Sequence, residues 1–534
     1  MSDDRRIAAW LFALFAFGYS FVGGWAPEDP DTEVAFQATR AIAAHGRLHL
    51  EPDTPSTRAI LSHLGPDGGA HNCRPGRDGR QYPYWGLAYV ASGLPPYFAG
   101  QALAAAFPSI EDEFGKQRFT ASGIEGSDYF ARAAVLALSP IFAAATLALV
   151  YLAARRIGVS PAASCVAAVV LGTTSFGVQA RSGLSDVQGT FWVALALERA
   201  FAALERPRAA LGFGAACGIA LLTLLRAPMA AAPLAVLVAG CAARRGGARE
   251  AARTIGWMAL GAAPFVAACL LANFVRWGDP LITGFEKSTA TATFWLPWRH
   301  RIVALARLLF SPGKGVAFYA LGLLVLGVAG TALLARRRGW IAAALASCVA
   351  FAWYVPASTI EWHGAWSFGP RYALPGFPAL AVASAVAVDA ARGAWRAVAL
   401  APAVAGFVLV LPGFVTSPYA AIAIAMERAR VEWPDSSFGE QYVAAEDRDT
   451  ERFQRICIAA GEMNPLRIQH EILVSTLRGR PLAPENRAPE LHGFASVGWW
   501  GFAERFDSGA VLVVPALLAF GALASVLRLR RALA

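Results

Sequence analysis

Apolar residues are grouped along this chain in long runs. Runs of about 20 mostly apolar residues, the length of a membrane-spanning helix, recur from one end of the sequence to the other. They predict spans at 7–24, 129–154, 161–180, 188–204, 209–226, 229–243, 254–275, 316–335, 340–358, 373–390, 396–414 and 509–527. The expected fold is therefore an all-α polytopic membrane protein, a bundle of about 12 transmembrane helices.

Arginines occur in short clusters at every second connection between these spans. Twelve crossings place all the clusters on one side of the membrane, as the positive-inside rule requires, and leave both termini cytoplasmic. The clusters are Arg5–Arg6, Arg155–Arg156, Arg206 with Arg208, Arg244–Arg245 with Arg249 and Arg253, Arg336–Arg338, Arg392 with Arg396, and Arg528 with Arg530 and Arg531.

One apolar stretch, 85–107, does not fit this count. It is long enough to cross, but a crossing there would move every later arginine cluster to the outside. Its Pro95–Pro96 pair also disrupts a continuous helix. We interpret it as a re-entrant or interfacial element on the outer face; a thirteenth span, with another span misassigned, is the alternative.

Composition excludes several classes of protein. Of 534 residues only 16% are charged, against about 25% in a soluble domain, and the net charge is +10. That basic excess does not indicate a nucleic-acid partner, because the arginines lie at span ends. Seven cysteines show no metal-ligand spacing, so no metal site is expected. Cys73 and Cys457 both fall in outer segments, and a disulfide between them is one hypothesis.

Loop lengths place the chemistry on the outer face. The cytoplasmic connections are short, whereas the outer segments 25–128, 276–315, 359–372 and 416–508 are substantial. We divide the chain into a transmembrane catalytic module, 1–414, with first outer loop 25–128; an outer helical segment, 415–508; and a last transmembrane helix with a basic cytoplasmic tail, 509–534.

Two sets of acids are candidates for catalysis. Asp31 and Glu33, with Glu28 and Asp29, precede an amphipathic helix in the first outer loop. Helix capping, with acids favoured by the helix dipole, is the plainer interpretation of these four. Asp186 lies at the outer mouth between the third and fourth spans. Because Arg181 precedes it, a loop ion pair between the two is an equally good interpretation.

Cations and aromatic residues occupy other outer loops. In FSPGKGVAFY, Lys314 stands between two glycines at a helix start, which suits an oxyanion. In EWHGAWSFGPRYALPG, Arg371 can pair bidentately with a phosphate, although interfacial anchoring with aromatic neighbours is the alternative. Tyr82 and Tyr84 in DGRQYPYWGLAY suit a sugar ring or an isoprenoid tail, and an interfacial belt explains them almost as well.

Seven motifs, in order, carry a resemblance over roughly residues 7–390. They are PDTEVAFQATRAIAAHG, DGRQYPYWGLAYVASGLPPY, DYFARAAV, SGLSDVQGTFWVALAL, NFVRWGDPLITGF, LFSPGKGVAFY and WSFGPRYALPGFP. Together they resemble the GT-C superfamily of polyprenyl-phosphate-sugar glycosyltransferases, especially bacterial relatives of the protein O-mannosyltransferases and of the aminoarabinose transferase of lipid A.

This resemblance implies a GT-C-like bundle in the bacterial plasma membrane, with re-entrant or juxtamembrane helices and a catalytic face on the periplasmic side. The implied partners are a polyprenyl-phosphate-sugar donor, a glycan, lipid or protein acceptor, and membrane lipid. The implied base is Asp31 of PDTE; since Thr32 separates it from Glu33, Asp29 and Glu33 are alternatives. Asp186 matches a second acid. Candidate substrate-binding residues are Arg371, Lys314, His363, Tyr372, Tyr82, Tyr84, Arg132 and Arg181.

The residues fit that chemistry. A carboxylate takes the proton of the acceptor hydroxyl, and cations hold the departing lipid phosphate. A single displacement inverts the anomeric centre. No cofactor is identified, and a divalent cation is left open. The alternatives are a transporter or flippase of lipid-linked sugars, an assembly subunit, or a ligase of lipid-linked glycans; the apolar span centres and the lack of a clear repeat disfavour a transporter.

Overall fold

The computed structural model describes residues 2–23, 30–62, 73–84, 86–115, 128–183, 185–224, 226–283, 297–359, 362, 364, 367–416, 418–432, 455–478 and 513–533. Apart from one hairpin, the regular structure in these ranges is helical. The elements are α1 (Ser2–Val22), α2 (Pro30–His45), α3 (Pro55–Ser62), β1 (Cys73–Pro75), β2 (Gln81–Pro83), α4 (Leu87–Ser92), α5 (Leu94–Ala106), α6 (Pro108–Gly115), α7 (Tyr129–Leu136), α8 (Leu138–Arg156), α9 (Pro161–Gly172), α10 (Ser175–Gln179), α11 (Ser185–Glu205), η1 (Pro207–Ala209), α12 (Ala210–Thr223), α13 (Arg226–Trp277), α14 (Trp298–Phe310), α15 (Val316–Tyr319), α16 (Leu321–Ala357), η3 (Arg371–Gly376), α17 (Phe377–Ala390), α18 (Ala394–Val415), α19 (Pro418–Glu432), α21 (Pro465–Leu477) and α23 (Val513–Leu533).

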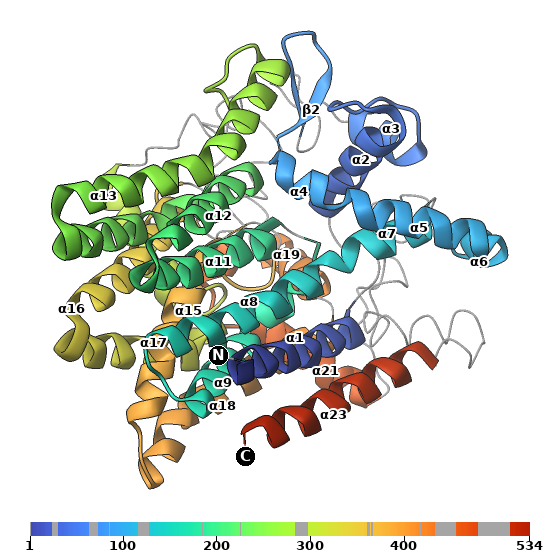
Figure 1. Cartoon of the computed structure of the whole chain (residues 1–534). Helices are drawn as coiled ribbons and strands as arrows, with labels where there is room; N and C mark the ends of the chain where they lie inside the picture. The colour runs from blue at the N-terminus through green and yellow to red at the C-terminus, as the bar shows by residue number, and fades with distance from the viewer. Residues whose placement is uncertain are drawn as a thin grey trace.

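Seven helical stretches in the described ranges are long and apolar enough to cross a membrane. Two of them, α13 and α16, are each a pair of helices joined at a break, at Gly246–Gly247 and at Arg338 respectively. Figure 1 shows both turning back at the left edge of the molecule. Both breaks lie within predicted arginine clusters. Helices thus occupy the predicted spans, and the number that cross the membrane stays a prediction.

The stretch 85–107 forms two short helices, α4 and α5, that meet at Gly93. Each is shorter than a membrane thickness requires. Pro95 and Pro96 lie in the first turn of α5, where a missing backbone N–H leaves no hydrogen bond broken. The stretch is therefore no single spanning helix, as its prolines predicted, and its path relative to the membrane stays a prediction.

Small residues allow the long helices to pack closely. A Cβ on Gly214 of α12 would lie 1.9 Å from the carbonyl oxygen of Met258 in α13. A Cβ on Gly330 of α16 would lie 1.8 Å from the carbonyl oxygen of Ala383 in α17. Both helix pairs are therefore in backbone contact, as is common where membrane helices associate through small residues.

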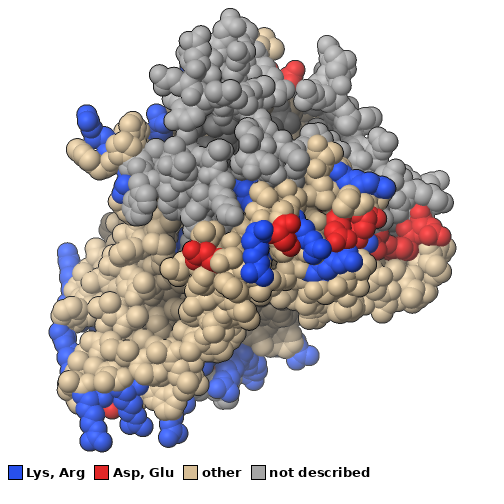
Figure 2. All heavy atoms as spheres, turned by 90° about the horizontal axis from the view of Figure 1, so that it is seen from above, with Lys and Arg blue, Asp and Glu red and all other residues tan. Residues whose placement is uncertain are grey.

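The basic ends of the helices gather at one end of the molecule. The first and last helices, α1 and α23, lie side by side, and both chain termini lie at the left ends of these two helices, in the lower central part of Figure 1. Figure 2 shows Lys and Arg side chains along the left and lower-left margins, whereas acidic side chains concentrate toward the right. This asymmetry agrees with the alternation of arginine clusters along the sequence.

The two outer cysteines are not joined. Both Cys73 and Cys457 are free and buried, so the disulfide hypothesis is wrong. Cys73 packs with Val34 and Leu50 beneath α2, whereas Cys457 lies against the loop that carries Lys314. The two thiols belong to different packing environments, a separation that sequence spacing does not encode.

A buried ion pair fixes helix α2 in place. An Arg132 guanidinium nitrogen on α7 lies 2.8 Å from Oε2 of Glu33 on α2, and neither side chain is more than 3% exposed. Gln37 donates to the other Glu33 oxygen at 2.8 Å, and the guanidinium lies 4.6 Å from the Phe36 ring centroid. The pair positions α2, and with it Asp31, against the bundle.

Replacing Arg132 with Met is expected to destabilise the protein strongly. The substitution leaves the Glu33 carboxylate buried without its cation, a loss of about 3–5 kcal/mol. Thermal unfolding in detergent measures it, with Arg47→Met as the control, because Arg47 forms a half-exposed pair with Glu51. Equal unfolding temperatures for the two variants would contradict the structural role of the buried pair.

Candidate active site

Four helical segments begin at one place in the structure. Asp31 is the second residue of α2 and Asp186 the second residue of α11. Arg226 begins α13 and Arg371 begins η3. We call these four residues, with Tyr372, the acid–arginine cluster. Carboxylates are favoured at helix N-termini by the helix dipole, and here each carboxylate also contacts a guanidinium.

Arg371 joins the two acids. Its guanidinium lies 3.4 Å from Oδ2 of Asp31, and its Nε lies 3.9 Å from Oδ2 of Asp186. Arg226 contacts the other oxygen of Asp186 and stacks on Tyr372, 3.8 Å from the ring centroid. Segments that lie far apart in the sequence therefore meet at one point.

The two acids differ in how they are held. The Asp31 side chain is 20% exposed and touches Arg371 at a distance longer than a strong charge-assisted hydrogen bond. The Asp186 side chain is 4% exposed and lies between two arginines. Asp31 is therefore the more accessible of the two acids, and Asp186 contacts both guanidinium groups.

The loop before Arg371 depends on glycine. Gly364 and Gly369 both have positive φ, at +77° and +64°. A Cβ on Gly364 would lie 2.7 Å from Cγ of Arg371. Only glycine at this position allows the loop to pass so close to the arginine side chain.

Lys314 secures the same loop. Its ammonium group donates to the carbonyl oxygen of Ser367, and the residue is only 1% exposed. Burial, together with the nearby Arg371 charge, lowers the pKa of Lys314 to about 8. Lys314 is thus a buried cation close to the cluster, and its contact with a phosphate stays a prediction.

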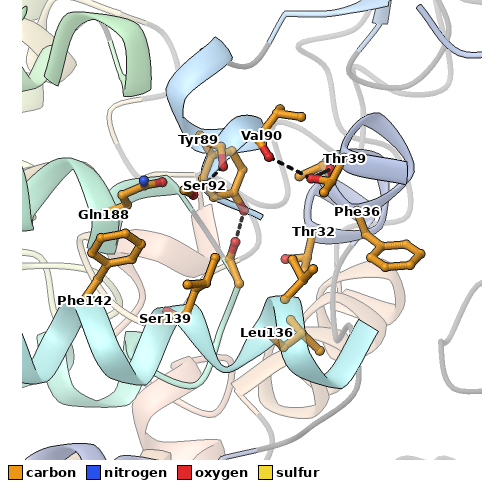
Figure 3. Close-up of a pocket in the computed structure, with 14 residues that line it drawn as sticks. Thr32, Phe36, Thr39, Tyr89, Val90, Ser92, Leu136, Ser139, Phe142 and Gln188 are labelled. Atoms are coloured by element: carbon orange, nitrogen blue, oxygen red, sulfur yellow. Dashed lines mark hydrogen bonds between the residues drawn. The ribbon is translucent and has the colours of Figure 1, made fainter. Parts of the chain in front are cut away.

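A small, uncharged pocket is lined by residues close in sequence to the two cluster acids (Figure 3). Its volume is about 30 Å³, and its walls come from α2, α4, α7, α8 and α11. Thr32 and Gln188, neighbours in sequence of the two cluster acids, both line it. Gln188 and Ser139 are buried, and within the described residues neither the Gln188 amide atoms nor the Ser139 hydroxyl has a hydrogen-bond partner. The pocket therefore offers donors and an acceptor in a mostly apolar wall.

Other predicted site residues lie elsewhere or serve the framework. Glu33 and Arg132 form the buried pair beneath α2, which favours Asp31 over Glu33 as the acid that meets substrate. Arg181 donates to the carbonyl oxygens of Gly413 and Thr416 at 2.9 and 3.1 Å. The loop ion pair between Arg181 and Asp186 is therefore wrong, because Asp186 pairs with Arg226 and Arg371 instead.

The hairpin tyrosines contact other partners. Tyr82 donates to Asp78 at 3.0 Å and packs edge-on against Trp277, while Arg74 lies over the Tyr84 ring. Their part in substrate binding stays a prediction. His363, Glu28 and Asp29 lie outside the described residues.

Two residues of this region escaped the sequence analysis. Arg226 fell inside the predicted span 209–226, whereas α12 ends at Thr223 and Arg226 starts the next helix. The signal in the sequence for Arg226 was a charge at the edge of an apolar run. The second residue is Gln188, an amide at the start of a predicted span. Among the described residues, no group of three or more His, Cys, Asp and Glu side chains could hold a metal ion.

The affinity for a polyprenyl phosphate is expected to begin to fall as pH rises through the Lys314 pKa of about 8. Deprotonation removes a positive charge beside Arg371, and the lipid phosphate has completed its own titration below this pH. Burial holds the pKa of the neighbouring Cys457 at about 12, so that thiol does not titrate here.

The measurement is lipid affinity against pH, with Lys314→Met alongside. The variant should bind roughly tenfold more weakly at pH 7, about 1.4 kcal/mol, and its affinity should no longer fall with pH. Constant affinity of the unmodified protein across this range would show that Lys314 does not act on the phosphate.

Comparisons with known proteins give distant likenesses. Neither a protein-family model nor a curated protein sequence matches the chain. ArnT from Cupriavidus metallidurans bound to undecaprenyl phosphate is similar with a TM-score of 0.45 and 14% identity, over 97% of this chain and 76% of that one. The apo oligosaccharyltransferase of Archaeoglobus fulgidus has a TM-score of 0.43 and 13% identity, over 86% of this chain and 60% of its own.

The archaeal oligosaccharyltransferase AglB from the same organism, in complex with an inhibitory peptide and a dolichol-phosphate, has a TM-score of 0.41 and 12% identity, over 88% of this chain and 55% of its own. The chain thus spans less than two thirds of the archaeal structures.

Proposed function

We propose that this chain is a membrane glycosyltransferase that moves a sugar from a polyprenyl-phosphate donor to an acceptor hydroxyl on the outer face of the plasma membrane. The observation that carries the proposal is the position of Arg371, which contacts Asp31 across 340 residues of sequence and also reaches Asp186. A carboxylate base and a phosphate-binding cation are thereby held side by side.

The charges of the cluster favour an anionic ligand. Asp31 and Asp186 contribute two negative charges, against two positive charges from Arg226 and Arg371. The buried Lys314 nearby adds a third positive charge while it is protonated. A lipid phosphate would therefore enter an environment with an excess of positive charge, and guanidinium groups bind phosphate in bidentate geometry.

The long contact between Arg371 and Asp31 suggests how donor binding prepares the base. At 3.4 Å this contact is looser than the 2.8 Å pair between Arg132 and Glu33. A phosphate competes with Asp31 for Arg371. When Arg371 turns to the phosphate, the Asp31 carboxylate becomes available to the acceptor, so the base is freed only when the donor is bound.

The transfer then needs one displacement. Asp31 takes the acceptor hydroxyl proton while the hydroxyl oxygen attacks the anomeric carbon. The bond between that carbon and the phosphate oxygen breaks, and its electron pair leaves with the polyprenyl phosphate, which Arg371 stabilises. Attack opposite the leaving group inverts the anomeric centre. Asp186, held by Arg226, keeps Arg371 aimed at the phosphate.

The pocket in Figure 3 supplies a place for neutral hydroxyl groups. The Gln188 amide both donates and accepts hydrogen bonds, and the Ser139 hydroxyl does the same. A sugar hydroxyl would satisfy these buried groups, which otherwise carry a desolvation cost. With a volume of about 30 Å³, the pocket can take a single hydroxyl-bearing group of the sugar or of the acceptor, but not a whole sugar ring.

The acid–arginine cluster also lies at the ends of the helices opposite the predicted arginine clusters. It forms at the N-terminal ends of α11 and α13, whereas arginine clusters follow the far end of α11 and the first half of α13. If basic residues face the cytoplasm, the cluster faces the outer side.

The test is sugar transfer by purified protein in liposomes, supplied with undecaprenyl-phosphate-linked sugars and a membrane extract as acceptor source. Asp31→Asn should lower sugar release by about 10²- to 10⁴-fold, because the base is lost, while undecaprenyl phosphate still binds. The control is Asp112→Asn, an exposed acid on α6.

Full transfer by Asp31→Asn would remove Asp31 from the catalytic role. Movement of labelled lipid between leaflets, without sugar release from any donor, would instead identify a flippase.

A further inference from the structure

A second cavity lies far along α13 from the acid–arginine cluster. It is a groove of about 460 Å³ between the first half of α13 and the second half of α16. Val236 and Gly240 line one wall, Ser347 and Phe351 the other, and Arg244 and Trp340 stand at one end. We call this cavity the α13–α16 groove.

The groove opens on the apolar surface of the bundle. Val236 is 75% exposed, Trp340 is 63% exposed and Phe351 is 48% exposed. In a helix that spans the membrane, such side chains face lipid. An apolar hollow at this position takes up hydrocarbon chains, because water cannot satisfy its walls.

Charge distinguishes one end of the groove. The Arg244 guanidinium lies 4.4 Å from the centroid of the Trp340 ring, a cation–π contact across the two helices. In the part of the chain that the structure describes, no carboxylate lies within ion-pair distance of Arg244. Its positive charge is therefore held in place by an aromatic ring without being neutralised.

Neighbouring arginines are engaged differently. Arg245 donates to the carbonyl oxygens of Ala203 and Leu204, and Arg338 donates to that of Ile157 at 3.0 Å. These contacts tie helices together at the basic end of the bundle. Arg244 alone of these three is presented at a hydrocarbon-lined cavity, with tryptophan beside it as at a membrane interface.

We propose that the α13–α16 groove binds one anionic phospholipid of the leaflet at the arginine-rich end of the bundle. The phosphate contacts Arg244, the glycerol region lies beside Trp340, and an acyl chain follows the groove past Val236 toward Phe351. Basic pockets between membrane helices recognise anionic headgroups in this way.

The position of the charge favours this occupant over the tail of a polyprenyl phosphate. A polyprenyl chain carries its phosphate at the cluster, near Arg226 at the start of α13, and would bring only hydrocarbon to Arg244. A phospholipid of the opposite leaflet brings its anion to Arg244 and its chains into the groove. This site is therefore separate from the proposed donor site, and the choice between the two occupants rests on the proposed function.

The occupant would stabilise two helices that support the cluster. Arg226 begins α13, and α16 ends at Ala357, shortly before the loop that carries Arg371. A lipid that bridges α13 and α16 holds the other ends of both helices together.

The experiment uses the full chain in nanodiscs and in detergent, with phosphatidylglycerol and phosphatidylcholine of identical acyl chains as probes. Native mass spectrometry counts retained lipid, and thermal unfolding reports its effect on stability. The unmodified protein should retain one phosphatidylglycerol and unfold at a higher temperature with it than with phosphatidylcholine.

Two variants test the headgroup and chain contacts separately. Arg244→Gln should reduce the preference for phosphatidylglycerol roughly fivefold, the effect of one arginine near a membrane surface. Ser347→Phe should fill the groove and reduce retention of both lipids. Arg253→Gln, a control in the second half of α13, beyond the break, whose side chain lies near Glu250, should leave both unchanged.

Three results would overturn the proposal. These are equal retention of the two lipids by the unmodified protein, an unaltered preference in Arg244→Gln, or displacement of the retained lipid by undecaprenyl phosphate at equimolar concentration.

Discussion

The position of one guanidinium group determines what this protein can do. Arg371 stands between Asp31 and Asp186 at the point where α2, α11, α13 and η3 begin. Without that cation, the two carboxylates would repel each other. With it, an acid and a guanidinium group share a single location, and under the proposed function the 3.4 Å contact to Asp31 is the one that a lipid phosphate replaces.

The surrounding structure serves to hold this arrangement. The buried pair of Glu33 and Arg132 fixes α2, so that Asp31 cannot drift from the bundle. Because Gly364 has no side chain, the Arg371 side chain fits beside the loop backbone. Lys314 holds that loop through its hydrogen bond to the carbonyl oxygen of Ser367. Arg226 holds Asp186 from the other side. Each support comes from a different segment, which explains why charged residues are concentrated in the connections of such an apolar chain.

The sequence predicted the positions of the helices well because hydrophobic run length and arginine placement are local signals. It also singled out Asp31, Asp186 and Arg371 as candidate site residues, through the motifs that carry the GT-C resemblance, and the structure places the three in contact. It did not predict which cation pairs with which acid. Arg226 was hidden at the edge of an apolar run, and Arg181 was given a partner by proximity in sequence, whereas tertiary packing directs it to backbone carbonyl oxygens. The disulfide hypothesis failed for the same reason, since loop length does not specify where two buried thiols lie.

The most direct test of this account is the position of a bound lipid phosphate. A structure of the protein determined with undecaprenyl phosphate should show phosphate oxygens within hydrogen-bond distance of Arg371, and the contact between Arg371 and Asp31 should be broken or lengthened. A phosphate bound elsewhere on the molecule, with the Arg371–Asp31 contact unchanged, would contradict the central claim.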